Sequence, residues 1–145
     1  MGGTNEQQLI DYSSFKIKLK EVRFDEVPVD SHEDDDFALK TKDDYDVVRI
    51  TDDKVELEFR REKYFEPEGF FKIKLVFGVF YRLHSSEKVG EEREKIIKEE
   101  LDKEYRSLLA PVAAMASLIV SALTSVDWKV PFIDPPLPII KKKNE

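Results

Sequence analysis

Two histidines, His32 and His84, carry the side chains that titrate nearest to neutral pH, and they lie far apart in the sequence. His32 lies beside Asp34 and Asp36, an acidic cluster of the kind that can hold a cation. The spacing of a calcium loop is not met, because Leu39 occupies the position at which that loop requires glycine. We therefore expect a solvated loop here and no metal site.

Other patterns typical of catalysis are missing from the sequence. It contains no Ser/His/Asp order, no HExxH zinc motif and no glycine-rich phosphate loop. The cysteine count is 0, which excludes disulfides, thiolate nucleophiles and cysteine-based zinc sites. General acid–base catalysis would have to use isolated surface carboxylates. We expect a protein that is not an enzyme and that needs no cofactor.

The composition indicates one acidic domain. A length of 145 residues is typical of a single domain, and 24 basic against 31 acidic residues give a net charge of −7. This balance argues against binding to nucleic acid or to anionic lipid, which both favour a basic surface. The segment Met1–Glu6 has neither the basic nor the apolar region of a signal peptide, so the expected location is the cytoplasm.

The first half of the sequence alternates between apolar and polar residues, as half-buried β-strands do. The first strand is expected from Phe15, with a phase slip at Glu21 that indicates a β-bulge. Two further extended stretches follow at 37–50, interrupted by Asp43-Asp44, and at 55–65.

The fourth strand, 71–83, has the most regular pattern. Lys72 and Lys74 on its second face give way to Val76 and Phe80, so part of this strand is expected to be covered on both faces. The unbroken apolar face consists of Phe71, Ile73, Leu75, Phe77, Val79, Tyr81 and Leu83.

After the strands, the period changes to that of a helix. Residues 91–106 are amphipathic, whereas 107–125 contain no charged residue. One helix over 91–125 would be about 50 Å long, which exceeds the diameter of about 38 Å expected for a compact domain of this size. Two explanations for the excess length stay open: the helix kinks or restarts at Pro111, whose ring presses on the carbonyl of Ser107, or the excess packs on another subunit.

The uncharged stretch must be buried on more than one side. A membrane span is the competing explanation, but the serines, the alanines and Pro111 within the stretch favour close helix–helix contact instead. We therefore expect no membrane insertion and an interface with another subunit. The expected interface residues are Leu108, Val112, Ala116, Ile119, Val120 and Leu123.

The order of these elements resembles the SecB protein-export chaperones. The residues that carry the resemblance are the uncharged helix with its segments 108–113 and 118–121, the proline-broken apolar arm around 131–136, and the crossing segment from Phe24 to Phe37 after the first strand. It covers about Phe15 to Ile140. The boundaries that follow are a flexible arm at 1–13, a SecB-like domain at 14–140 and a basic tail at 141–145.

The resemblance implies an α+β fold with a four-stranded antiparallel sheet and a long C-terminal helix packed on one face. It also implies a tetramer, built as a dimer of dimers, that holds unfolded or pre-secretory polypeptides in apolar grooves without ATP. The residues expected to line the groove are Val27, Val29, Phe37, Leu39, Val76, Phe80, Met115, Trp128, Phe132, Ile133 and Leu137. The alternative for Trp128, Phe132, Ile133 and Leu137 is that the apolar arm folds back as cover for the core. Both roles hold if the arm covers part of the core and exposes the rest.

Two alternatives remain open from the sequence. SecB proteins commonly continue into a second helix and an acidic tail that contacts the SecA motor, whereas this sequence continues from Pro138 into 141–145, which is basic. Delivery to SecA is thus doubtful, and a SecB-like chaperone that controls a toxin–antitoxin pair is a second reading. The third is a domain that binds a small apolar ligand in a pocket lined by Tyr64, Phe71, Phe77 and Tyr81.

Overall fold

The computed structural model describes residues 8–29, 36–128 and 136–140, with the side chains of 126–128 left out. Its elements are β1 (Ile10–Val27), β2 (Ala38–Ile50), β3 (Lys54–Glu66), β4 (Phe70–Leu83) and α1 (Gly90–Trp128).

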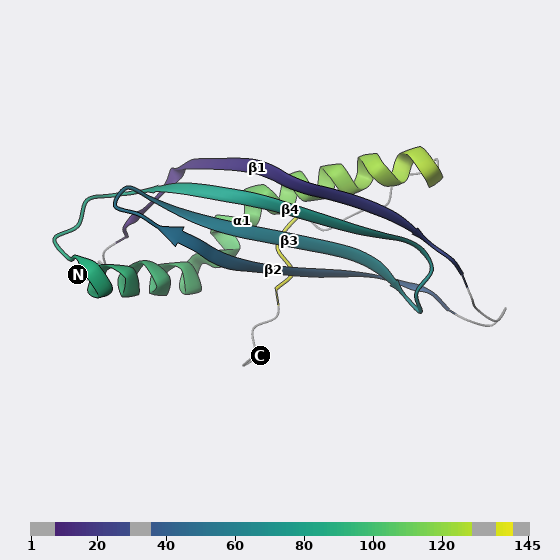
Figure 1. Ribbon diagram of the computed structural model, residues 1–145, viewed down its shortest axis with the longest axis horizontal. Helices are drawn as coiled ribbons and strands as arrows, with labels where there is room; N and C mark the ends of the chain where they lie inside the picture. Colours follow the sequence, from purple (N-terminus) through teal and green to yellow (C-terminus); the bar gives the residue numbers. More distant parts are fainter. Residues whose placement is uncertain (1–7, 30–35, 129–135, 141–145) are drawn as a thin grey trace.

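The four strands form one antiparallel sheet in the order β1-β4-β3-β2. The chain crosses from β1 at one edge of the sheet to β2 at the other, and β2, β3 and β4 then follow as neighbours joined by tight turns (Figure 1). The helix α1 lies on one face of the sheet. The α+β architecture with a C-terminal helix on one face is therefore confirmed. We call the face that α1 covers the inner face and the opposite one the outer face.

β1 begins earlier than the alternation indicated. Leu9 is 4% exposed and Ile10 is 2% exposed, so residues 8–13 belong to the fold and the flexible arm predicted for 1–13 is wrong over this part. These residues are held by two hydrogen bonds to the helix. The backbone amides of Leu9 and Ile10 donate to the Glu100 carboxylate at 2.8 Å and 3.3 Å. The bulge expected at Glu21 is confirmed by a shift of register between Leu19 and Glu21.

β2 is continuous, and the predicted interruption at Asp43-Asp44 is wrong. Asp43 lies opposite Arg61 of β3 in the ladder, on the inner face, and its carboxylate pairs with the Arg61 guanidinium. A charge that looked like a break in the sequence is thus satisfied inside the sheet by its cross-strand neighbour.

The core lies between the inner face of the sheet and α1. All of the apolar face predicted for the fourth strand is buried, from Phe71 to Leu83. The Tyr81 hydroxyl donates a 2.5 Å hydrogen bond to the Leu108 carbonyl, and burial of this phenol raises its pKa to about 12. The helical residues of the core are Ile97, Leu101, Tyr105, Leu108, Leu109, Val112, Ala113, Ala116 and Val120.

α1 is broken at Glu104 and not at Pro111. Glu104 has φ −113° and ψ 16°, outside helical values, whereas Pro111 lies within the helix. The break lies next to Tyr105, whose ring stacks on that of Tyr45 at 5.9 Å between centroids. The charged first half of α1 therefore runs beside one end of the sheet, and the uncharged second half crosses the inner face towards β1 (Figure 1).

Within α1, one 18-residue window has a mean hydropathy of 1.9, which by length and composition suffices to cross a membrane. The structure buries 39% of that window. Core helices of soluble proteins pass the same test, so this property alone is weak support for a membrane span.

Candidate functional site

Aromatic side chains gather at the end of the sheet where the β3–β4 turn lies. The ring of Phe70 contacts that of Phe37 at 4.8 Å and that of Phe65 at 5.0 Å, both edge to face. Phe71 joins them through Phe65 at 5.1 Å and stacks on Phe24 at 5.5 Å. We call these five residues the aromatic end. Pairs of this geometry are favourable beyond the area that they bury, so the five rings stabilise one another as an apolar platform.

Both described ends of the crossing connection, at Val29 and Phe37, pack against the same platform. A methyl group added at Gly69 would meet the Phe37 ring at 3.1 Å and the Val29 side chain at 3.2 Å, which shows how closely these groups approach the turn. Val29 is 45% exposed, and Phe37 is half-buried. Together with half-buried Val27 and Leu39, four of the residues predicted for the groove therefore belong to this region.

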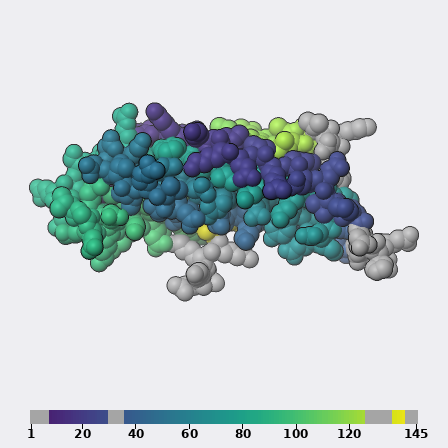
Figure 2. Space-filling view, in the orientation of Figure 1, coloured from purple at the N-terminus to yellow at the C-terminus, as the bar shows by residue number. Residues whose placement is uncertain are grey.

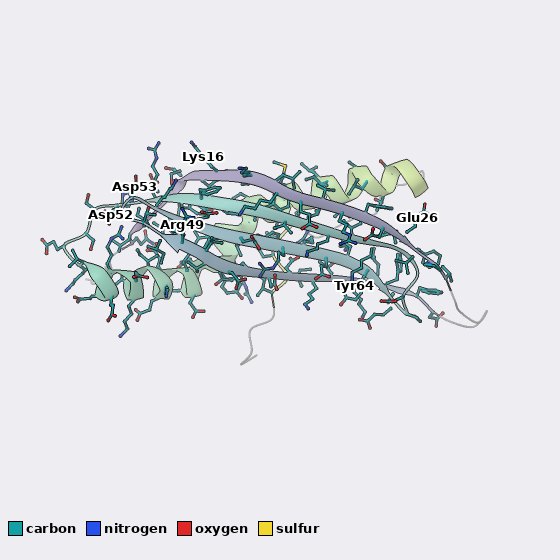
Figure 3. All side chains as sticks on the ribbon, in the orientation of Figure 1. Lys16, Glu26, Arg49, Asp52, Asp53 and Tyr64 are labelled. Carbon is teal, nitrogen blue, oxygen red and sulfur yellow. The ribbon has the colours of Figure 1, made fainter. Side chains whose placement is uncertain are left out.

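A pocket of about 240 Å³ opens beside the aromatic end. Val27, Phe65 and Phe71 contribute apolar surface, and Tyr64 lies on β3 near the same end of the sheet (Figure 3). Charged side chains surround the opening: Lys42, Glu62, Glu68 and Lys72. A pocket for a small ligand usually measures about 300–1,000 Å³, so this one fits a side chain better than a whole ligand.

Val76 and Phe80 do not join this region. They alternate with the buried face of β4 and therefore lie on the outer face, where Val76 is 7% exposed. The chain covers them itself: the Lys20 side chain approaches Gly78 between them, with its Cε atom 3.0 Å from a methyl group placed there. Their assignment to the same groove as Phe37 is wrong, because the sheet separates the two surfaces.

The remaining groove residues lie on or after α1. Met115 is 43% exposed on the second half of the helix, and Leu137 is 62% exposed. Trp128 ends α1, but its side chain is not among those described. Phe132 and Ile133 lie outside the described residues.

Of the residues expected at a subunit interface, most already lie in the core of this chain. Leu108, Val112, Ala116 and Val120 are each 0% exposed, so they have no surface left for another subunit. Ile119 and Leu123 are half-buried at the border of the core. The sequence shows two adjoining apolar stripes on this helix. The stripe that we assigned to a partner subunit packs on the sheet of the same chain instead.

The free face of α1 carries a different apolar set. Leu118 is 68% exposed and lies one turn from Met115 on the same side of the helix. The second half of α1 runs towards β1, whose inner face exposes Leu19 and Val22 at 46% and 44%. Phe15, with its ring 6.4 Å from that of Tyr81, is 44% exposed. Figure 2, a view onto the outer face, shows the end of α1 beyond β1.

The outer face is charged instead. Arg60 binds Asp44, Asp46 and Glu58 at 2.7 Å each, and Lys20 pairs with Glu56 at 3.5 Å. Partial desolvation lowers the Arg60 pKa, but the hydrogen bonds to these carboxylates outweigh it and raise that pKa above its usual value. Figure 3 shows Lys16 at the β1 edge.

The inner face contains one fully buried ion pair that the sequence did not reveal. Arg61 binds Asp43 in a bidentate manner, with Nε to Oδ1 and Nη2 to Oδ2 both at 2.8 Å, and both side chains are 0% exposed. Each also binds the backbone of the segment 136–140. Arg61 Nη2 donates to the Leu137 carbonyl at 3.0 Å, and the Ile139 amide donates to Asp43 Oδ2 at 2.7 Å. The sequence did contain one signal for this pair. Asp43 and Arg61 alternate in step with the apolar residues of their strands that lie on the inner face.

Within residues 8–29, 36–128 and 136–140, no three His, Asp or Glu side chains gather closely enough to hold a metal ion. The acidic cluster near His32 falls partly outside these residues. The features that this part of the chain does offer are apolar surface and backbone-binding polar groups.

Comparison with known proteins gives a match at the level of structure. No family model and no curated protein matches the sequence. A SecB-like chaperone of Mycobacterium tuberculosis, solved in complex with a ChAD peptide from the HigA1 antitoxin, aligns with a TM-score of 0.54 and 11% identity over 87% of this chain and 89% of that one. A protein of unknown function from Streptococcus agalactiae aligns with a TM-score of 0.47 and 10% identity over 83% of this chain and 92% of that one. The chain thus has a SecB-like fold.

Proposed function

We propose that this protein is a chaperone that holds extended, unfolded segments of other polypeptides without nucleotide, metal or covalent chemistry. The segments bind on the inner side of the molecule, by which we mean the side of the sheet that carries α1, including the free face of this helix. The observation that carries the proposal is the uneven distribution of exposed large apolar side chains. On the inner side these are Phe15, Leu19, Val22, Met115, Leu118, Leu137 and Ile139. Elsewhere in the described residues the exposed large apolar side chains are Val29, Val48 and Val89. Exposed apolar side chains that gather in one patch are typical of sites that bind other chains.

The SecB-like fold supports this proposal over the small-ligand alternative. One structural neighbour is a chaperone solved in complex with a peptide, and the pocket beside the aromatic end is below the usual size for a small ligand. Because that neighbour binds an antitoxin peptide, we propose antitoxin-type clients before pre-secretory ones.

The experiment is suppression of aggregation of an unrelated unfolded protein. We expect suppression at stoichiometric amounts by the wild type, and loss of most of it in Leu118→Glu, because a charge interrupts the apolar face of α1. Ser107→Glu adds the same charge at an exposed position of the same helix and serves as the matched control. No suppression by the wild type, or equal loss in both variants, would contradict the proposal.

We further propose that copies of this chain associate through the free face of α1 and the exposed inner side of β1, to a dimer of dimers. Such an assembly would cover Leu19, Val22, Met115 and Leu118. The surface left open for a client is then Phe15, Leu137 and Ile139. In that case Leu118→Glu lowers the chaperone activity through loss of the assembly, which light scattering of the variant would show. Light scattering at micromolar concentration tests the assembly separately from the chaperone activity. A stable monomer would rule it out.

A further inference from the structure

The segment 136–140, which bends at Pro136 and Leu137, lies on the inner side of the sheet, behind β3 in the view of Figure 1. Two hydrogen bonds join its backbone to the sheet: the Leu137 carbonyl accepts from Arg61, and the Ile139 amide donates to Asp43. Leu137 is 62% exposed and Ile139 is 39% exposed, whereas Ile140 packs against the core. The sheet thus binds this segment through its main chain more than through these two side chains.

The two contacts fit an extended chain of almost any sequence. In an extended peptide, the carbonyl of one residue and the amide of the residue two positions later point to the same side. The paired guanidinium and carboxylate present a donor and an acceptor side by side, as the edge of a neighbouring strand would. The residue between, Pro138, has its backbone nitrogen directed to the other side, so proline is tolerated there.

The loss of these two hydrogen bonds would cost free energy. Asp43 and Arg61 are both fully buried, and charged groups that lose hydrogen-bond partners in such a place are destabilised. If the segment 136–140 leaves, the oxygen of Asp43 that it satisfied needs another donor, which is either water or an amide of another chain. An extended segment of another chain supplies the same carbonyl and amide in the same geometry.

We propose that Asp43 and Arg61 form a clamp for the backbone of an extended peptide, that residues 136–140 of the chain itself occupy it, and that an unfolded client segment binds by displacing them. This inference rests on the proposed chaperone function and names a mode of recognition and regulation within it. The clamp accepts proline at the middle position of its occupant and rejects it at the third, where the amide is required.

The first experiment uses a fluorescent peptide of the sequence PLPIIKK, which corresponds to residues 136–142, as the probe. Ile139→Pro in the full-length chain removes the amide that binds Asp43, and Ile139→Ala keeps it while it removes most of the side chain. We expect Ile139→Pro to bind the probe at least about tenfold more tightly than Ile139→Ala, because the internal competitor is weakened. Equal affinity in the two variants overturns the clamp, whatever the aggregation assay gives.

The second experiment needs no variant of the protein. Methylation of the probe on the nitrogen that corresponds to Ile139 should abolish its binding to the wild type, and methylation one residue later should not. Hydrogen exchange at the Ile139 amide of the wild type should accelerate when an unfolded client is added in excess. Unchanged protection of this amide overturns displacement. Displacement without suppression of aggregation would keep the clamp and overturn the chaperone function.

Discussion

Arg60 and Arg61 are neighbours on β3, yet the sheet places them in opposite environments. Arg60 lies on the outer face among three carboxylates, of which Asp44 and Asp46 are 53% and 69% exposed. Arg61 lies on the inner face and pairs with the Asp43 carboxylate, and both side chains are 0% exposed. The comparison teaches that exposure to solvent decides how much an ion pair matters here, because solvent screens the outer network and not the inner pair.

The largest effect is expected from Arg61→Ala. This change leaves the Asp43 carboxylate buried without its cation, which typically costs about 3–5 kcal/mol of the free energy of unfolding. Urea denaturation measures it. The double variant Asp43→Leu/Arg61→Met is the control, since replacing both charges by apolar side chains should restore part of the loss. A loss below about 1 kcal/mol in the single variant would contradict the buried pair.

A second test of the inner face is Tyr81→Phe. The hydroxyl that donates to the Leu108 carbonyl is lost, and the carbonyl remains in the core without this donor. We expect a loss of about 1–3 kcal/mol in the free energy of unfolding, again by urea denaturation. Tyr64→Phe, on the outer face, is the matched control and should change stability less. If both variants lost the same free energy of unfolding, the buried hydroxyl of Tyr81 would contribute no more to stability than that of Tyr64.

The same residue predicts a decline of stability in alkali. The pKa of Tyr81 is raised from 10.0 to about 12 by burial, so its phenol ionises in the unfolded chain before it does in the folded one. The stabilisation is therefore complete below pH 10 and is lost as the pH rises towards 12. Thermal unfolding between these pH values should show a steeper decline in the wild type than in Tyr81→Phe. If the stability of both proteins fell equally with pH, the loss in alkali would not come from ionisation of Tyr81.

The smallest effect is expected from Arg60→Ala. Although it removes three ion pairs, the partners stay solvated, and exposed pairs of this kind contribute about 0–1 kcal/mol. The effect should also shrink in high salt, which screens surface charges. Urea denaturation at two ionic strengths measures it. A loss as large as that of Arg61→Ala would remove the distinction between the two faces.

The regular parts of the fold were predictable from the sequence. The apolar face of β4 and the bulge at Glu21 are confirmed, because the period of two reports directly which residues share a face. The change to a helical period also placed α1 correctly to within a few residues. These features depend on local pattern alone.

The site was less predictable, because it depends on which elements meet. Asp43 was interpreted as a break since nothing in the sequence gives the register that sets it opposite Arg61. The buried stripe of α1 was assigned to a partner, because only the position of the sheet decides between two adjoining stripes. The assignment of Phe80 to the groove was an avoidable error. The alternation along β4 already placed Phe80 on the other face of the sheet from Phe71.

The position of β1 in the sheet determines the order in which the chain can fold during synthesis. β2, β3 and β4 follow one another as neighbours, so each can pair as soon as it leaves the ribosome. β1 is made first, but its partner is β4, and its first residues also need Glu100 of the helix. The earliest strand must therefore wait unpaired for nearly the whole domain, and during that time the nascent protein is itself an extended, unfolded client.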